Sequence, residues 1–120
     1  YNQPNVPRPY RCYMIGEALR RAIEDMPDDR RVAVIASGGL SHFVTDETLD
    51  LGMLKALERG DAAALKAIPP KALRAGSSEI LNWILAGGAF AGLPIRWSEY
   101  IPVYRTPAGM GVGLAFGVWR

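Results

Sequence analysis

The feature that most constrains the fold of this chain is an apolar run, rich in β-branched residues, that ends at two consecutive glycines. Residues 31–37 read Arg-Val-Ala-Val-Ile-Ala-Ser, and Gly38 and Gly39 follow. A short apolar run without polar alternation is typical of a strand that is buried on both faces. A Gly-Gly pair lets the backbone turn sharply where such a strand ends. We therefore expect residues 31–37 to form an interior strand of a sheet.

Helix and strand signals surround this predicted strand. Apolar residues recur with helical spacing after Pro9, which suits the first turn of a helix. Cap residues and apolar stripes predict further helices. The expected helices cover about 9–26, 46–59, 62–68 and 79–86, with caps at Thr45 or Asp46, at Asp61, and at Ser77 or Ser78. Gly87 and Gly88 are expected to end the last of them. Two extended segments, 93–104 and 111–119, follow around a turn at 106–109.

This order of elements predicts an α/β fold in which helices pack on a central mixed sheet. Three strands make a thin sheet for four helices, and a strand buried on both faces needs neighbours on both sides. The sequence also lacks a starting Met, and prolines at 4, 7 and 9 favour an extended strap that arrives from earlier structure. We therefore expect residues 1–120 to be the C-terminal portion of a single domain whose N-terminal half is absent from this chain.

Charge, hydropathy and cysteine content exclude several classes of protein. The net charge is +2 without a basic stripe, so nucleic acid is not an expected partner. No apolar run approaches the length of a membrane span, so no membrane association is expected. The single cysteine, Cys12, excludes an internal disulfide and fits a reducing, cytoplasmic compartment. Within a predicted helix, Cys12 is interpreted as a small buried hydrophobe.

His42 is the first candidate for a catalytic residue. It is the only histidine, and it follows the Gly-Gly turn at the end of the predicted strand. In open α/β sheets, ligands bind beyond the carboxyl ends of the strands. Imidazole is suited to proton transfer near neutral pH. The alternative is a turn histidine whose ring is satisfied by local hydrogen bonds.

Glu79 is the second candidate. It begins an apolar helix after Gly76-Ser77-Ser78, and Trp83 lies four residues on, so the two share a helix face. The alternative is a carboxylate that only complements the helix dipole.

The glycines at 109, 111 and 113 enter a strand, which excludes a dinucleotide loop. Ser41 lacks the flanking G-x-S-x-G pattern of a nucleophile elbow.

Several stretches together resemble a known family. Residues 36–42, Ala-Ser-Gly-Gly-Leu-Ser-His, resemble the second-half motif of the class III extradiol ring-cleavage dioxygenases, the group that contains the catalytic subunit of protocatechuate 4,5-dioxygenase. Residues 9–19 are similar to the helix before that motif. Residues 76–89 are similar to the segment with a glutamate four residues before a tryptophan. Residues 104–111 are similar to the closing turn. The resemblance covers nearly the whole chain.

The resemblance implies a non-haem Fe(II) enzyme that opens a catecholic ring with O₂ next to the diol. Glu79 would be the carboxylate ligand of a two-histidine, one-carboxylate site. His42 would be an acid/base outside the metal's ligand set, and Tyr104 and Thr106 would lie at the rim of the substrate pocket. Both histidine ligands would come from the missing N-terminal half, because His42 is the only histidine here. The chain is therefore expected to be inactive alone and to belong to a homo- or hetero-oligomer.

Two other functions remain open from the sequence. A non-catalytic binding or signalling protein on the same fold would lack the metal site, since a fold does not fix a function. A hydrolase or nucleotide-binding domain that uses the Gly38-Gly39 turn is the second alternative. Two histidines upstream in the parent gene would favour the dioxygenase. Nucleotide binding, or reaction with an acyl probe without iron, would favour the second alternative.

Overall fold

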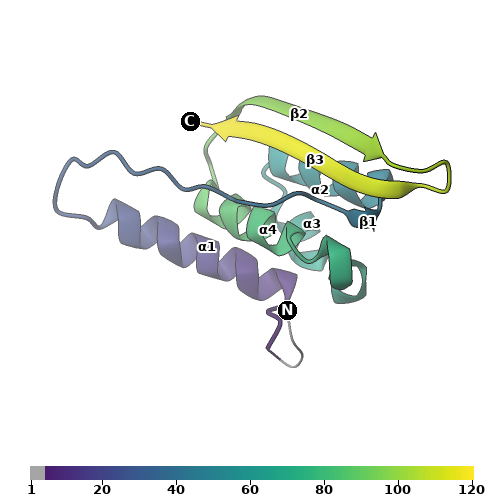
Figure 1. Cartoon of the computed structure of the whole chain (residues 1–120). Coiled ribbons are helices and arrows are strands. Elements are labelled where there is room, and N and C mark those ends of the chain that lie inside the picture. The colour runs from purple at the N-terminus through teal and green to yellow at the C-terminus, as the bar shows by residue number, and fades with distance from the viewer. Residues whose placement is uncertain (1–4) are drawn as a thin grey trace.

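The computed structural model describes residues 5–120 as helices packed on one side of a small sheet (Figure 1). The elements in chain order are α1 (Pro9–Glu24), β1 (His42–Val44), α2 (Glu47–Glu58), α3 (Ala62–Ala67), the 3₁₀ turns η1 (Pro70–Leu73) and η2 (Ala75–Ser77), α4 (Ile80–Ala89), β2 (Ile95–Tyr104) and β3 (Met110–Trp119). The strand order is β1-β3-β2, and the described pairings are antiparallel. The predicted α/β class, with helices packed on a sheet, is confirmed.

In the hairpin of β2 and β3, strand β3 carries its small side chains on one face and its large ones on the other. Its register runs from Ile95 opposite Trp119 to Tyr104 opposite Gly111. Because side chains alternate along a strand, one face of β3 carries only small residues, Gly111, Gly113, Ala115 and Gly117. The other face, here called the outer hairpin face, carries Trp97, Glu99, Ile101, Val103, Val112, Leu114, Phe116 and Val118. Ala115 is buried, whereas Trp97 and Phe116 are each 49% exposed. The hairpin therefore presents its larger apolar side chains outward.

Helices α1 and α4 cross at unusually short range, through two glycines. A Cβ on Gly88 would collide with the carbonyl oxygen of Tyr13, and a Cβ on Gly16 would collide with the carbonyl oxygen of Leu85. The two backbones are thus in direct contact. The prediction that Gly87 and Gly88 end the last helix is wrong, because α4 continues to Ala89. Gly88 is needed for this backbone contact, whereas a Cβ on Gly87 would lie 2.6 Å from the side chain of Leu57.

The core lies between the helices and the small-residue face of the hairpin. Its fully buried large side chains are Leu40, Met53, Leu65, Ile80 and Ile84.

The caps at Asp46 and Asp61 are confirmed, since their side chains accept hydrogen bonds from the amides of Leu49 and Ala64. The cap predicted at Ser77 or Ser78 is wrong. Glu79 precedes α4 without a side-chain cap, and the Ser78 hydroxyl donates to the carbonyl of Ala75.

The predicted interior strand at residues 31–37 is also wrong. This segment is described as irregular, and Ile35 is 83% exposed. Grooves of about 470 and 150 Å³ run along residues 32–36, between that segment, the end of α4 and residues 117–119 of β3. The backbone hydrogen bonds of residues 5–120 include none from 31–37. A strand buried on both faces requires pairing partners, and the described residues supply none to this segment.

Two further expectations concern the ends of the elements. The proline-rich strap is irregular over residues 5–8, while its part at 1–4 lies outside the described residues. Pro9 occupies the first turn of α1, as predicted.

Over residues 5–120, none of the helices combines the length and the apolar character needed to cross a membrane.

Candidate active site

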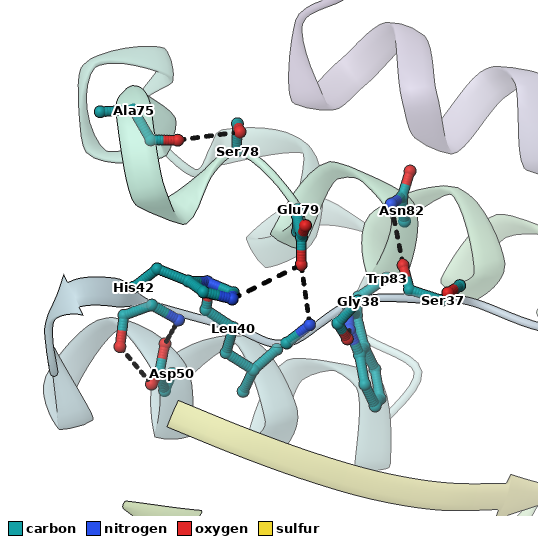
Figure 2. Close-up of polar contacts among 12 residues, drawn as sticks. Ser37, Gly38, Leu40, His42, Asp50, Ala75, Ser78, Glu79, Asn82 and Trp83 are labelled. Atoms are coloured by element: carbon teal, nitrogen blue, oxygen red, sulfur yellow. Dashed lines mark hydrogen bonds and ion pairs between the residues drawn. The ribbon is translucent and has the colours of Figure 1, made fainter. Parts of the chain in front are cut away.

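The Gly-Gly turn is held in place by side chains of α4 (Figure 2). Asn82 donates its amide N–H to the carbonyl of Ser37 at 3.0 Å, and the Trp83 indole donates to the carbonyl of Gly38 at 3.0 Å. Gly38 has a φ of 118°, a conformation that favours glycine. A Cβ there would also lie 2.5 Å from Oε2 of Glu79. The turn therefore needs glycine both for its backbone angle and for the approach of the carboxylate.

Glu79 directs its carboxylate at this turn. It directly precedes the buried residues of α4, and its Oε2 accepts a hydrogen bond of 2.9 Å from the amide of Gly39. Its side chain is 42% exposed. A backbone N–H bond to one oxygen fixes the orientation of the whole carboxylate. Partial exposure leaves it accessible to a ligand.

His42 faces the same carboxylate from β1. Its Nε2 lies 3.7 Å from Oε2 of Glu79, and its Nδ1 lies 3.0 Å from the carbonyl oxygen of Leu40. A carbonyl oxygen can only accept, so Nδ1 carries the proton in that hydrogen bond. In the neutral ring, Nε2 is then the basic nitrogen, and it is the one that points toward Glu79. The distance of 3.7 Å exceeds hydrogen-bond range, so the pair is ionic only when the imidazole is protonated.

A buried carboxylate lies directly below this site and was missed by the sequence reasoning. Asp50, on α2, is 0% exposed. Its Oδ1 accepts the amide of Ser41 at 3.0 Å, and its Oδ2 accepts the hydroxyls of Ser41 at 2.7 Å and of Tyr100 at 2.8 Å. Burial raises the pKa of Asp50, while these hydrogen bonds act in the opposite direction. Burial and the bond to Asp50 raise the pKa of Tyr100.

The sequence did contain a signal for Asp50. It precedes Met53, Leu54 and Leu57 by three, four and seven residues, so it lies on their apolar helix face. An acidic residue at a core position predicts a buried polar network, because an unpartnered buried charge is costly.

The two residues predicted at the pocket rim lie at the turn end of the hairpin, the same end at which β1 pairs with β3. Tyr104 is 51% exposed, and its hydroxyl donates to the carboxylate of Glu47. That bond raises the pKa of Tyr104. Thr106 lies in the turn, with its Oγ1 buried and without a hydrogen-bond partner in the described part of the chain. The polar contacts described for residues 5–120 join neither of them to His42 or Glu79. Their role in substrate binding stays a prediction.

The donor set of this chain does not complete a metal site. Within residues 5–120, no group of three or more His, Cys, Asp or Glu side chains could hold a metal ion. His42 is the only histidine in the sequence. Glu79 fits the carboxylate position of a two-histidine, one-carboxylate centre, and both histidine positions would have to be filled from outside this chain. Cys12 is buried, burial raises its pKa, and it takes no part in the site.

Comparison with known proteins identifies the family of this chain. Residues 3–115 match the family model described as the catalytic LigB subunit of aromatic ring-opening dioxygenase. The match covers most of the chain, so the chain belongs to this family. The resemblance inferred from the sequence is confirmed at this level.

A curated relative adds a local match. A gallate dioxygenase of Pseudomonas putida is 55% identical over 42 residues, which are 35% of this chain and 12% of that protein. The chain thus matches only a small part of the length of that relative.

Proposed function

We propose that this chain is the C-terminal part of an Fe(II)-dependent extradiol dioxygenase that opens a catecholic ring with O₂ next to the diol. The observation that carries the proposal is the pairing of Glu79 and His42. Both are partly exposed, both face the Gly-Gly turn, and Nε2 of His42 lies 3.7 Å from Oε2 of Glu79. Family membership over residues 3–115 supports a ring-opening dioxygenase as the class of enzyme.

In this proposal Glu79 is the single metal ligand that the chain supplies. Its Oε2 is held by the amide of Gly39, so the carboxylate is oriented before a metal binds, and its partial exposure leaves it accessible. Fe(II) bound by two histidines and one carboxylate keeps open positions for small ligands. Both histidines would come from the N-terminal half of the domain.

His42 would serve as the acid/base group. The hydrogen bond from Nδ1 to Leu40 leaves Nε2 as the nitrogen that can take up a proton. Nε2 faces the space next to the Glu79 carboxylate. A hydroxyl of a catechol placed there would therefore meet a base on one side. Once protonated, the imidazolium would be stabilised by the nearby carboxylate, and it could return the proton later.

The exposed apolar surface supports an incomplete domain. The outer hairpin face combines seven apolar residues with only one charge, and Ile35 is 83% exposed. Contiguous apolar surface of this kind marks an interaction site. The N-terminal half of the domain would cover this surface. An assembly of several subunits in the cytoplasm, as expected from the sequence, fits the same proposal.

The substrate would be a catecholic small molecule. The curated match to a gallate dioxygenase supports an aromatic substrate with adjacent hydroxyls. Tyr104 and Thr106, at the hairpin turn, would contact a ring substituent when the N-terminal half encloses the pocket. The Tyr104 hydroxyl is already oriented by Glu47, so it could present its oxygen to such a group.

The test uses the complete polypeptide that contains this sequence. Glu79→Ala should lose most of the bound iron, measured by elemental analysis of the purified protein. His42→Ala should keep iron near the wild-type content and slow O₂ consumption with a catechol by about 100-fold or more, within the range known for general acid–base groups. Glu24→Ala is the matched control, because Glu24 is exposed and pairs only with Arg20 among the described residues.

Two results would contradict the proposal. Full iron retention in Glu79→Ala would remove Glu79 from the ligand set, and unchanged turnover in His42→Ala would remove His42 from the reaction. If the complete polypeptide contained no further pair of histidines, the non-catalytic binding protein would become the better interpretation.

A further inference from the structure

We infer that Asp50 is a positioning residue for His42, which acts by holding the peptide bond between Leu40 and Ser41. The inference rests on the proposed acid/base role of His42. Asp50 touches neither His42 nor Glu79 in any described polar contact, so its role would be indirect. Four observations carry the inference.

The first observation is the concentration of hydrogen bonds on Ser41, the residue before His42. Its amide and its hydroxyl both donate to the Asp50 carboxylate, at 3.0 and 2.7 Å. The hydroxyl oxygen also accepts from the amide of Asp46 at 2.9 Å, and its carbonyl accepts from the amide of Gly113 at 2.8 Å. Each polar group of Ser41 is therefore bonded. One fixed carboxylate accounts for two of these four bonds.

The second observation links Asp50 to the imidazole through a planar group. The carbonyl of Leu40 and the amide of Ser41 belong to one peptide unit, and in a trans peptide they point in opposite directions. The amide donates to Oδ1 of Asp50, while the carbonyl oxygen lies 3.0 Å from Nδ1 of His42. Rotation of this plane would break both bonds at once. By holding the amide, Asp50 also holds the oxygen that fixes the orientation and the tautomer of His42.

The third observation is that the sheet leaves room for Asp50 at one glycine. A Cβ on Gly113 would collide with Oδ2 of Asp50 and would lie 3.1 Å from the Tyr100 hydroxyl. Gly113 also bonds the backbone on both sides of the same peptide, since its carbonyl accepts from Leu40 and its amide donates to Ser41. The small-residue face of β3 thus admits the carboxylate and clamps the peptide that the carboxylate orients.

The fourth observation is the cost of the arrangement. Asp50 is 0% exposed, and a buried carboxylate is expensive unless its partners satisfy it. An apolar residue at this position of α2 would avoid the cost of burying a carboxylate, but it would leave the donors of Ser41 and Tyr100 without this acceptor. The retained carboxylate lies where it orients the backbone next to the candidate base, which is the role we assign to it.

The experiment is a double-mutant cycle in the complete, iron-loaded enzyme, with Asp50→Leu, His42→Ala and the combination. Asp50→Leu should lower kcat about 10-fold or more, with KM and iron content near wild type. In the His42→Ala background it should lower kcat by less than about twofold, because a positioning residue has nothing left to position. Asp50→Asn should keep kcat within about fivefold of wild type, since an amide oxygen can still accept from Ser41.

Asp61→Leu is the matched control. It makes the same substitution at the cap of α3, where Asp61 accepts from Ala64, and it should lower stability while leaving kcat within about twofold. If Asp50→Leu does not fold, Asp50→Ser replaces it in the cycle, because a serine side chain at this position is too short for its hydroxyl to reach the Ser41 amide.

The outcomes separate this inference from the proposed function. An equal loss of kcat from Asp50→Leu with and without His42 would overturn the inference, as would a loss that appears only in iron content. Both results leave the role of His42 intact. Unchanged turnover in His42→Ala alone would overturn the proposed function, and the positioning role would fall with it.

Discussion

The crossing of α1 and α4 gives a substitution whose effect is opposite to its intrinsic propensity. Glycine in a helix interior is about 1 kcal/mol less favourable than alanine, so Gly88→Ala should be stabilising if only the helix mattered. The structure predicts the reverse. A Cβ at Gly88 would collide with the Tyr13 carbonyl oxygen and would lie 3.0 Å from the amide of Glu17 and 3.1 Å from Cα of Gly16. The backbone atoms in its way cannot move unless the helices separate.

The magnitude follows from these two effects. Overpacking a core by one methyl group costs about 1–3 kcal/mol, and contact with backbone atoms places this case at the upper end. Subtracting the gain in propensity leaves a net destabilisation of about 2 kcal/mol. Unfolding entropy is about 2 cal/mol/K per residue, or about 0.25 kcal/mol/K for the 120 residues of this chain. Gly88→Ala should therefore lower Tm by about 8 °C.

Gly52→Ala is the internal control for this experiment. Gly52 also lies inside a helix, α2, but a Cβ there meets no atom within 4 Å. Only the propensity effect remains, so the same substitution should stabilise by about 0.5–1 kcal/mol and raise Tm by about 2–4 °C. Thermal and urea unfolding, followed by far-UV circular dichroism, measure both variants. A neutral or stabilising Gly88→Ala would refute the close approach of the two helices.

Three further predictions concern a cap, a buried charge and an exposed side chain. Asp46→Ala should cost about 1 kcal/mol in urea unfolding, because its side chain caps α2 by accepting from Leu49, and a value near zero would exclude the cap. Burial raises the pKa of Asp50, so the folded state keeps this proton to a higher pH than the unfolded chain. The stability of wild type relative to Asp50→Asn should therefore fall as pH rises from about 4 to the raised pKa, and a difference that rises with pH would contradict the burial effect. Ile35→Asp should change stability by less than about 0.5 kcal/mol in the 120-residue chain, where Ile35 is 83% exposed, but by more than about 2 kcal/mol in the complete polypeptide, and equal effects in both would argue against a covering N-terminal half.

Local signals explain which parts of the fold were predictable. The helix at Pro9–Glu24, the caps at Asp46 and Asp61, and the hairpin of β2 and β3 follow from spacing, turn residues and side-chain chemistry within a few positions. The strand expected at 31–37 failed because strand formation requires partners that local sequence does not show. Its apolar composition was interpreted as a sign of burial on both faces, whereas Ile35 is 83% exposed in the structure.

The glycines show a second limit. Gly87 and Gly88 have the pattern of a helix end, yet both lie inside α4, where Gly88 meets the backbone of α1. Whether a glycine ends a helix or admits a neighbour depends on Gly16, which is more than 70 positions earlier in the sequence. No local rule contains that information.

The residues of the candidate site were predictable from the sequence, whereas the hydrogen bonds that orient them were not. His42 and Glu79 were found from their positions after a turn and before an apolar helix, and the structure brings the two together. Their roles remain predictions. The bonds that orient them come from backbone groups and from Asp50, and these depend on the contact between α2 and the sheet. In the sequence, the only sign of that contact was the acidic residue Asp50 on an apolar helix face.

The exposed edge of the hairpin has a consequence for the behaviour of this chain in solution. With the strand order β1-β3-β2, the ten-residue strand β2 lies at an edge, and unpaired edges next to apolar faces promote association between chains. Two residues in β2 work against this: Pro102 cannot donate a backbone hydrogen bond, and Glu99 places a charge among the apolar side chains of the outer hairpin face. They act as gatekeepers. Replacing them with β-branched residues would turn this hairpin into a template for aggregation.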